Sequence, residues 1–148
     1  MNVVINDQDI LRFKNIQLDE RLTCDLEMLM MGAFKPLEGF MSEEDYHSVL
    51  ESMRLKNGQL YPIPVILPVS EGVLKNIGNE EFLLLRDTFN LPIALLELRG
   101  IFKRDKRKEC ITVLKTEDIK HPYVQEIYLS GDYCLEGGVF TSETTRTL

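Results

Sequence analysis

The chain has 148 residues, of which 44% are hydrophobic and 28% charged, and its formal net charge is −7. This balance is typical of one globular domain with a packed core and excludes the apolar-poor, highly charged composition of disordered chains. The negative charge argues against a large phosphate-binding surface, so a nucleic-acid partner is not expected and any anion site must be local.

The compartment is indicated by what the chain lacks. Residues 1–13 include Asp7 and Asp9 and contain no continuous apolar region of a leader peptide. No apolar run approaches the ~20 residues needed to cross a bilayer, so no membrane association is expected. The cysteines, Cys24, Cys110 and Cys134, are odd in number and widely spaced, which argues against a disulfide framework or a metal site. We therefore expect a cytoplasmic protein with reduced, buried thiols.

The first predicted elements are an entering strand or arm within residues 1–18 and a helix of about three turns after it. Asp19 or Thr23 is the candidate N-cap of this helix, and Gly32 is its candidate stop. Apolar side chains at helical spacing define its buried side: Leu22, Leu26, Leu29 and Met30.

Residues 32–41 form a loop punctuated by glycine and proline that carries large apolar side chains. Such a loop must dock somewhere, either in the core of its own domain or against a partner. Its candidate docking residues are Phe34, Lys35, Leu37, Phe40 and Met41. A second helix is predicted from Ser42, its N-cap, to Met53, with three acidic residues in its first turn.

After the turn signal at residues 57–58, the pattern predicts strands at 63–69, 81–86 and 93–102. Prolines in and before the first of these predict an edge strand or a bulge, because proline donates no ladder hydrogen bond. Residues 70–77 predict a single helical turn or a loop. A last strand with a bulge or tight turn is predicted around residues 133–140, and the polar residues 141–148 are typical of a frayed end or a linker start.

The one basic cluster lies between the last two predicted strands, where Asp105 is a candidate cap of a short helix running through Ile111 to Leu114. It has two interpretations: a solvated helix start, or a contact for an anion or RNA. Its cations are Lys103, Arg104, Lys106, Arg107 and Lys108.

Early helices followed by strands predict an α+β domain with a mostly antiparallel or barrel-like sheet. No glycine-rich phosphate loop is present, and His47 and His121 stand alone without a metal-binding or phosphate-binding partner motif. We therefore assign no catalytic, cofactor-binding or metal-binding residue and expect no cofactor.

Several segments share a pattern with one known family. The most specific is Gly-x-Phe-x-Pro-Leu-x-Gly-Phe-Met at residues 32–41, and further matching segments lie at 24–29, 43–46, 53–55, 57–58, 61–65, 121–122, 131–133 and 137–138. Over about residues 20–140 the chain resembles the N-terminal domain of ATP sulfurylases (sulfate adenylyltransferases). The resemblance implies a PUA-like fold with N-terminal helices and a mixed, largely antiparallel, barrel-like sheet, in one domain spanning residues 1–148.

In that family a following domain makes adenylyl sulfate and pyrophosphate from ATP and sulfate, in sulfate assimilation. Its catalytic segments, Gln-x-Arg-Asn, His-Pro-x-x-Gly or His-x-x-His, and Gly-Arg-Asp, have no match here; His121-Pro122 lacks the glycine of its motif. The resemblance therefore implies a non-catalytic domain that is inactive alone, with the catalytic domain absent or separate.

Two functions remain open. The chain is an accessory domain that docks to a separate or missing ATP sulfurylase catalytic domain, or it is a free-standing PUA-like binding module for RNA or another ligand. A complete small enzyme with an unrecognised site is a third and weaker interpretation. If the loop at 32–41 is exposed rather than buried, its apolar surface also predicts self-association.

Overall fold

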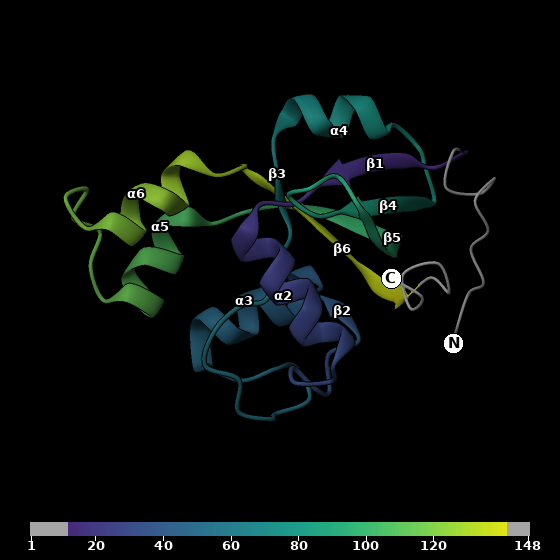
Figure 1. Ribbon diagram of the computed structural model, residues 1–148. Coiled ribbons are helices and arrows are strands. Elements are labelled where there is room, and N and C mark those ends of the chain that lie inside the picture. Colours follow the sequence, from purple (N-terminus) through teal and green to yellow (C-terminus); the bar gives the residue numbers. More distant parts are fainter. Residues whose placement is uncertain (1–11, 142–148) are drawn as a thin grey trace. The chain divides into compact units, whose positions relative to one another are not determined.

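The computed structural model describes residues 12–141 (Figure 1). Most of the expected N-terminal arm (1–11) and almost all of the expected tail (142–148) lie outside these residues. The chain divides into two compact units, described separately below. Unit 1 contains described residues 12–40, 77–99 and 137–141, and unit 2 contains residues 41–76 and 100–136.

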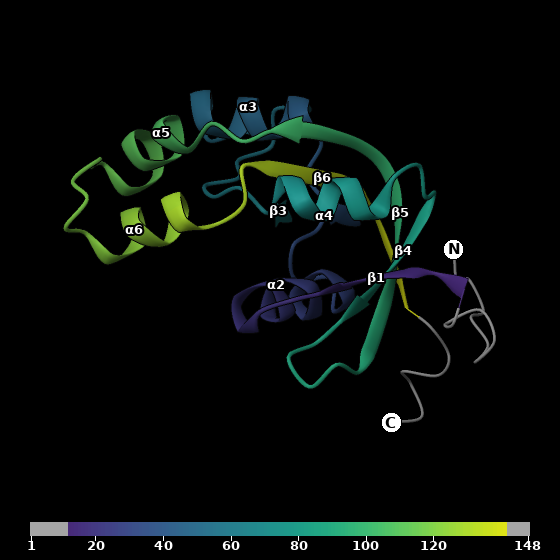
Figure 2. The ribbon, with the colours of Figure 1, turned by 90° about the horizontal axis from the view of Figure 1, so that it is seen from above.

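Unit 1 is built on paired strands and one helix. Strand β1 (Lys14–Gln17) pairs in parallel with β4 (Phe82–Arg86), and β4 pairs antiparallel with β5 (Pro92–Lys103). The turn of residues 87–91 connects β4 to β5 at one end of this hairpin (Figure 2). The short strand β2 (Gly39–Phe40) pairs antiparallel with β6 (Tyr133–Thr141).

Helix α2 (Glu20–Met30) lies between β1 and β2 in the chain. Of its two candidate caps, Asp19 is the one used: its side chain accepts a hydrogen bond from the backbone N of Leu22 at 2.8 Å. Gly32 follows the helix with a φ of +78°, a backbone conformation that glycine adopts without steric cost.

Unit 2 contains most of the helices. They are α3 (Glu43–Ser52), most of α4 (Glu71–Ile77), α5 (Lys106–Glu109), the π-helix η1 (Cys110–Leu114) and α6 (Pro122–Leu129), with β3 (Pro68–Val69) pairing antiparallel with β6. Ser42 caps α3 as predicted, accepting a hydrogen bond from Asp45 N at 3.2 Å.

Within residues 12–141 the strands form one six-stranded sheet in the order β1-β4-β5-β6-β2, with β3 paired to β6 off this path. Because β1 pairs in parallel and the pairs β2–β6, β3–β6 and β4–β5 are antiparallel, the sheet is mixed and largely antiparallel. This confirms the predicted α+β class. The sheet is not closed into a barrel, since β1 and β2 stand at opposite ends of the strand order.

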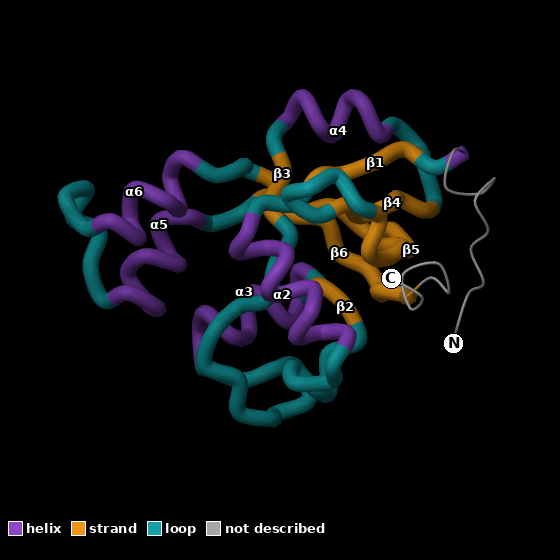
Figure 3. The backbone as a smooth tube through the Cα atoms, in the orientation of Figure 1, coloured by secondary structure: helices purple, strands orange, loops and turns teal. Residues whose placement is uncertain are grey.

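Two local predictions needed correction, and one helix was missed. Only Pro68–Val69 of the predicted strand at 63–69 is a strand, and the rest is loop (Figure 3), because Pro62 and Pro64 supply no N–H to a ladder there. Residues 70–77, predicted to be a single helical turn or a loop, contain the seven-residue helix α4. Helix α6 was not predicted, although His121 caps it and Pro122 occupies its first turn.

The core of unit 1 lies along β4 and β5, where Leu83, Leu84, Leu85, Leu95 and Leu96 are each at most 1% exposed. Consecutive residues of a strand point to opposite faces, so these strands are covered on both faces, which explains their unbroken apolar sequences.

Candidate functional site

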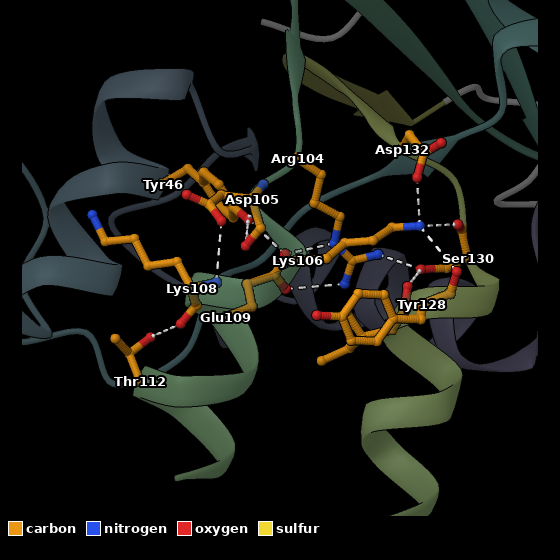
Figure 4. Close-up of polar contacts among 11 residues, drawn as sticks. Tyr46, Arg104, Asp105, Lys106, Lys108, Glu109, Thr112, Tyr128, Ser130 and Asp132 are labelled. Atoms are coloured by element: carbon orange, nitrogen blue, oxygen red, sulfur yellow. Dashed lines mark hydrogen bonds and ion pairs between the residues drawn. The ribbon is translucent and has the colours of Figure 1, made fainter. Parts of the chain in front are cut away.

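The basic segment of residues 103–108 connects the end of β5 to the start of α5 in unit 2. Asp105 caps α5, as predicted, by accepting a hydrogen bond from Lys108 N at 3.1 Å. Figure 4 shows the polar contacts that converge on this segment from α3, α5 and the end of α6. These contacts decide which cations are available to a ligand.

Arg104 forms a buried ion pair with Glu109. Its Nε donates to Glu109 Oε2 at 2.6 Å and its Nη2 donates to Oε1 at 3.0 Å, and the two side chains are only 7% and 4% exposed. The third guanidinium nitrogen, Nη1, donates to the hydroxyl of Ser130. A two-point contact of this kind neutralises both charges and matches the planar geometry of guanidinium and carboxylate.

Tyr46 completes the cluster from helix α3. Its hydroxyl donates to Glu109 Oε2 at 2.5 Å and accepts from the backbone N of Asp105 at 3.1 Å. The ring is fully buried and packs on Phe102 with a centroid separation of 5.2 Å. We call Tyr46, Arg104, Glu109 and Ser130 the Glu109 cluster; it joins α3, the segment after β5, α5 and the end of α6.

The protonation states in the Glu109 cluster are held by burial and by charge. Burial, and then the charge and hydrogen bond of Glu109, raise the pKa of Tyr46. Burial by itself would lower the pKa of Arg104, but the hydrogen bonds and charge of Glu109 outweigh it and raise that pKa. The phenol therefore stays neutral and the guanidinium stays charged near neutral pH, so neither residue is suited to proton transfer.

Lys106 also points into unit 2. Its Nζ contacts the carbonyl oxygens of Ser130 at 2.7 Å and Tyr128 at 3.1 Å, at the C-terminal end of α6, and Asp132 Oδ1 at 2.6 Å. A cation here offsets the negative end of the helix dipole. The hydrogen bond and charge of Lys106 lower the pKa of Asp132.

The other cations of the segment are nearer to solvent. Arg107 Nε lies 3.0 Å from Glu117, and Lys108 Nζ lies 3.0 Å from Glu51. Lys103 is exposed. The structure thus keeps the five candidate contact residues along one segment, but it turns Arg104 and Lys106 inward and pairs Arg107 and Lys108 with carboxylates.

The loop at residues 32–41 has both buried and accessible side chains. Phe40 in β2 is 4% exposed, and the adjacent Met41 is 1% exposed. Phe34 and Leu37 are half-buried, and Lys35 is exposed. Burial of Phe40 and Met41 favours a core role for that end of the loop and leaves Phe34, Lys35 and Leu37 as its accessible part.

The cysteines were expected to be buried, and Cys110 and Cys134 are; Cys24, in α2, is exposed. Burial raises the pKa of Cys134 to about 12, so this thiol stays protonated near neutral pH. Among residues 12–141, no group of three or more His, Cys, Asp and Glu side chains is placed to hold a metal ion. None of the helices in the same stretch is both long and apolar enough to span a bilayer.

Sequence reasoning did not identify the Glu109 cluster. Glu109 follows a run of basic residues, and Tyr46 lies inside the second predicted helix, so neither position indicated a buried polar contact. The spacing of five residues between Arg104 and Glu109 was the one local hint, because a short capped helix between them brings them onto the same side.

Comparison with known proteins gives consistent matches. A family model described as a PUA-like domain matches residues 5–144. The chain is 41% identical over 128 residues to a sulfate adenylyltransferase of Trichormus variabilis, and 42% identical over 125 residues to one of Ignicoccus hospitalis. These alignments cover 86% and 83% of this chain but only 33% and 32% of the relatives, so the chain spans about a third of their length.

A solved structure resembles the fold as well. The hexameric APS kinase from Thiobacillus denitrificans matches with a TM-score of 0.65 and 26% sequence identity. The match covers 90% of this chain and 22% of that one. In both comparisons nearly the whole chain corresponds to a minor part of a longer protein.

Proposed function

Because this chain belongs to the PUA-like domain family and resembles the N-terminal part of sulfate adenylyltransferases, we propose that it is the non-catalytic N-terminal domain of a protein of that type. The observation that carries the proposal is the unequal coverage: 86% of this chain aligns with 33% of a relative. The remaining two thirds of such a protein would supply the reaction of ATP with sulfate, in cytoplasmic sulfate assimilation.

The charge arrangement supports a structural role for this domain. Joining sulfate to a nucleotide phosphate brings several negative charges together, which requires positioned cations or amide donors facing the substrate. Arg104 and Lys106, the most deeply placed cations of the basic segment, are already bound to Glu109 and Asp132. Their contacts stabilise unit 2 and leave little charge for an anion.

The accessible part of the 32–41 loop is the candidate contact with the catalytic domain. Phe34 and Leu37 offer half-buried apolar surface, and Lys35 offers an exposed charge beside it. An interface of this composition, apolar at its centre with a charged rim, is typical of domain contacts.

Two assays test the proposal. The purified chain, given ATP, sulfate, magnesium and pyrophosphatase, is expected to release no phosphate above a blank without protein. A chimera in which this chain replaces the matching third of the Trichormus variabilis enzyme is expected to turn over. Sulfate-dependent turnover by the chain alone would contradict the non-catalytic role, and a folded but inactive chimera would contradict the assignment to this type of protein.

A further inference from the structure

The turn between β4 and β5 holds an aromatic side chain in solvent. Phe89 is 83% exposed and its neighbour Leu91 is 50% exposed. Scattered apolar residues on a surface are ordinary and need no explanation by themselves. Phe89 differs from such residues because hydrogen bonds fix the backbone on both sides of it.

Asp87 organises the turn. Its Oδ1 accepts hydrogen bonds from the backbone N of Phe89 and of Leu91, both at 2.9 Å. Two backbone hydrogen bonds close the turn: Asp87 N donates to Leu91 O at 2.9 Å, and Asn90 N donates to Asp87 O at 3.0 Å. Four hydrogen bonds thus surround Phe89, and Asn90 takes a left-handed φ of +66° within them.

Two side chains from the strands of unit 1 fix the turn from outside. Arg86 Nη1 donates to Asn90 O at 2.9 Å, and Gln17 Nε2, from β1, lies 3.4 Å from Asp87 O and 3.5 Å from Thr88 O. The charged groups of the turn, Arg86 and Asp87, are engaged with its backbone. The tip that remains for a partner is the uncharged ring of Phe89 with Leu91 beside it.

We propose that the turn of residues 87–91 is a preorganised docking element in which Phe89 is the anchor. An aromatic side chain has few rotamers to lose, and a turn already fixed by hydrogen bonds loses little backbone entropy on binding. Anchors of this kind carry a disproportionate share of binding energy when their ring enters a closed apolar pocket.

The occupant is an apolar pocket on the catalytic portion of a sulfate adenylyltransferase, so this inference rests on the proposed function. The chain matches only 33% of its relative from Trichormus variabilis, so in a protein of that type this domain is joined to a further portion about twice its size. The engaged charges of the turn favour an uncharged pocket over an acidic or basic one.

The test uses the chimera of this chain with the unmatched two thirds of the Trichormus variabilis enzyme, and the free chain beside it. Hydrogen exchange is followed by mass spectrometry in peptides covering β4 and β5. In the chimera, Phe89→Ser is expected to raise the exchange rate of these amides roughly tenfold, which corresponds to losing a modest interface anchor. In the free chain the same substitution is expected to change nothing, because the ring is already in solvent.

Leu129→Ser is the matched control, since Leu129 in unit 2 is 87% exposed. It is expected to leave exchange unchanged in both proteins. Equal exchange in the Phe89→Ser and wild-type forms of an active chimera would overturn the anchor and leave the proposed function standing. An inactive chimera would overturn both. A free chain that sediments as a dimer, and as a monomer after Phe89→Ser, would assign the turn to a second copy and overturn the proposed occupant.

Discussion

The hydroxyl of Tyr46 donates a 2.5 Å hydrogen bond to Oε2 of Glu109, a residue 63 positions further along the chain. The same oxygen accepts from Arg104 Nε at 2.6 Å. One carboxylate, only 4% exposed, thus joins helix α3 to the segment that follows β5.

Glu109→Gln tests how much this carboxylate contributes to the free energy of unfolding. Gln fills the same space but leaves the buried guanidinium of Arg104 without a counter-charge, so we expect a loss of ~3 to 5 kcal/mol in the free energy of unfolding. Glu117→Gln is the control, because its partner Arg107 is exposed and an exposed ion pair contributes little to stability. Urea unfolding measures both; a loss for Glu109→Gln as small as that for Glu117→Gln would contradict the stabilising role of the buried carboxylate.

Lys106→Met tests the pairing with Asp132 through pH. The pKa of Asp132 is lowered in the folded chain from 3.8, so its stabilising contribution is present above that value and is lost as pH falls through the folded pKa. Removing the Lys106 charge should raise the pKa of Asp132 toward 3.8. A carboxyl-carbon NMR titration reads this directly, and an unchanged titration of Asp132 in the variant would contradict the pairing.

Phe40→Ala separates a core role from a docking role at the end of the 32–41 loop. The ring is 4% exposed, and truncating a buried Phe costs ~3 to 5 kcal/mol through lost transfer energy and a cavity. Leu37→Ala, at a half-buried position, should cost less. Thermal melts with sedimentation of each variant decide the question: a stable Phe40→Ala protein would move the ring from the core to an interface.

Gly39→Ala should disrupt the pairing of β2 with β6. A Cβ at residue 39 would lie 1.9 Å from the carbonyl oxygen of Gly137 and 2.7 Å from the Cα of Gly138, and both are backbone atoms. We expect a loss of ~1 to 3 kcal/mol as the strands shift. Gly72→Ala, in α4, is the control: its Cβ would be 3.8 Å from the nearest atom, and alanine should stabilise the helix by up to ~1 kcal/mol.

The RNA-binding alternative can be tested at Lys103 and Arg107. Both are exposed, whereas the ammonium group of Lys106 already contacts helix carbonyls and is less available to a ligand. We expect no salt-dependent RNA binding by the wild-type chain, measured by fluorescence anisotropy between low and high salt. Binding that falls with salt, and that is lost in a Lys103→Glu, Arg107→Glu double variant, would instead support a free-standing binding module.

The elements predicted correctly are those whose signals are local. Asp19, Ser42 and Asp105 each cap a helix through a backbone N–H three residues away, so four residues of sequence contain the whole interaction. The apolar runs of β4 and β5 were likewise predicted as strands, at 81–86 and 93–102, and the structure has them at Phe82–Arg86 and Pro92–Lys103. The segment at 63–69 has the apolar composition of a strand, but proline has no N–H to donate to a ladder, and only its last two residues pair as a strand.

The α+β class, the caps Ser42 and Asp105 and the family could be inferred from the order of the residues, since each rests on short-range patterns or on a contiguous motif. Which cations are buried could be learned only from the folded chain, because burial depends on partners distant in the sequence: Tyr46 contacts Glu109 across 63 residues, and Lys106 contacts Ser130 across 24. No periodicity encodes such pairs. A basic run therefore has the same sequence pattern whether its charges face solvent, as that of Lys103 does, or a buried carboxylate, as that of Arg104 does.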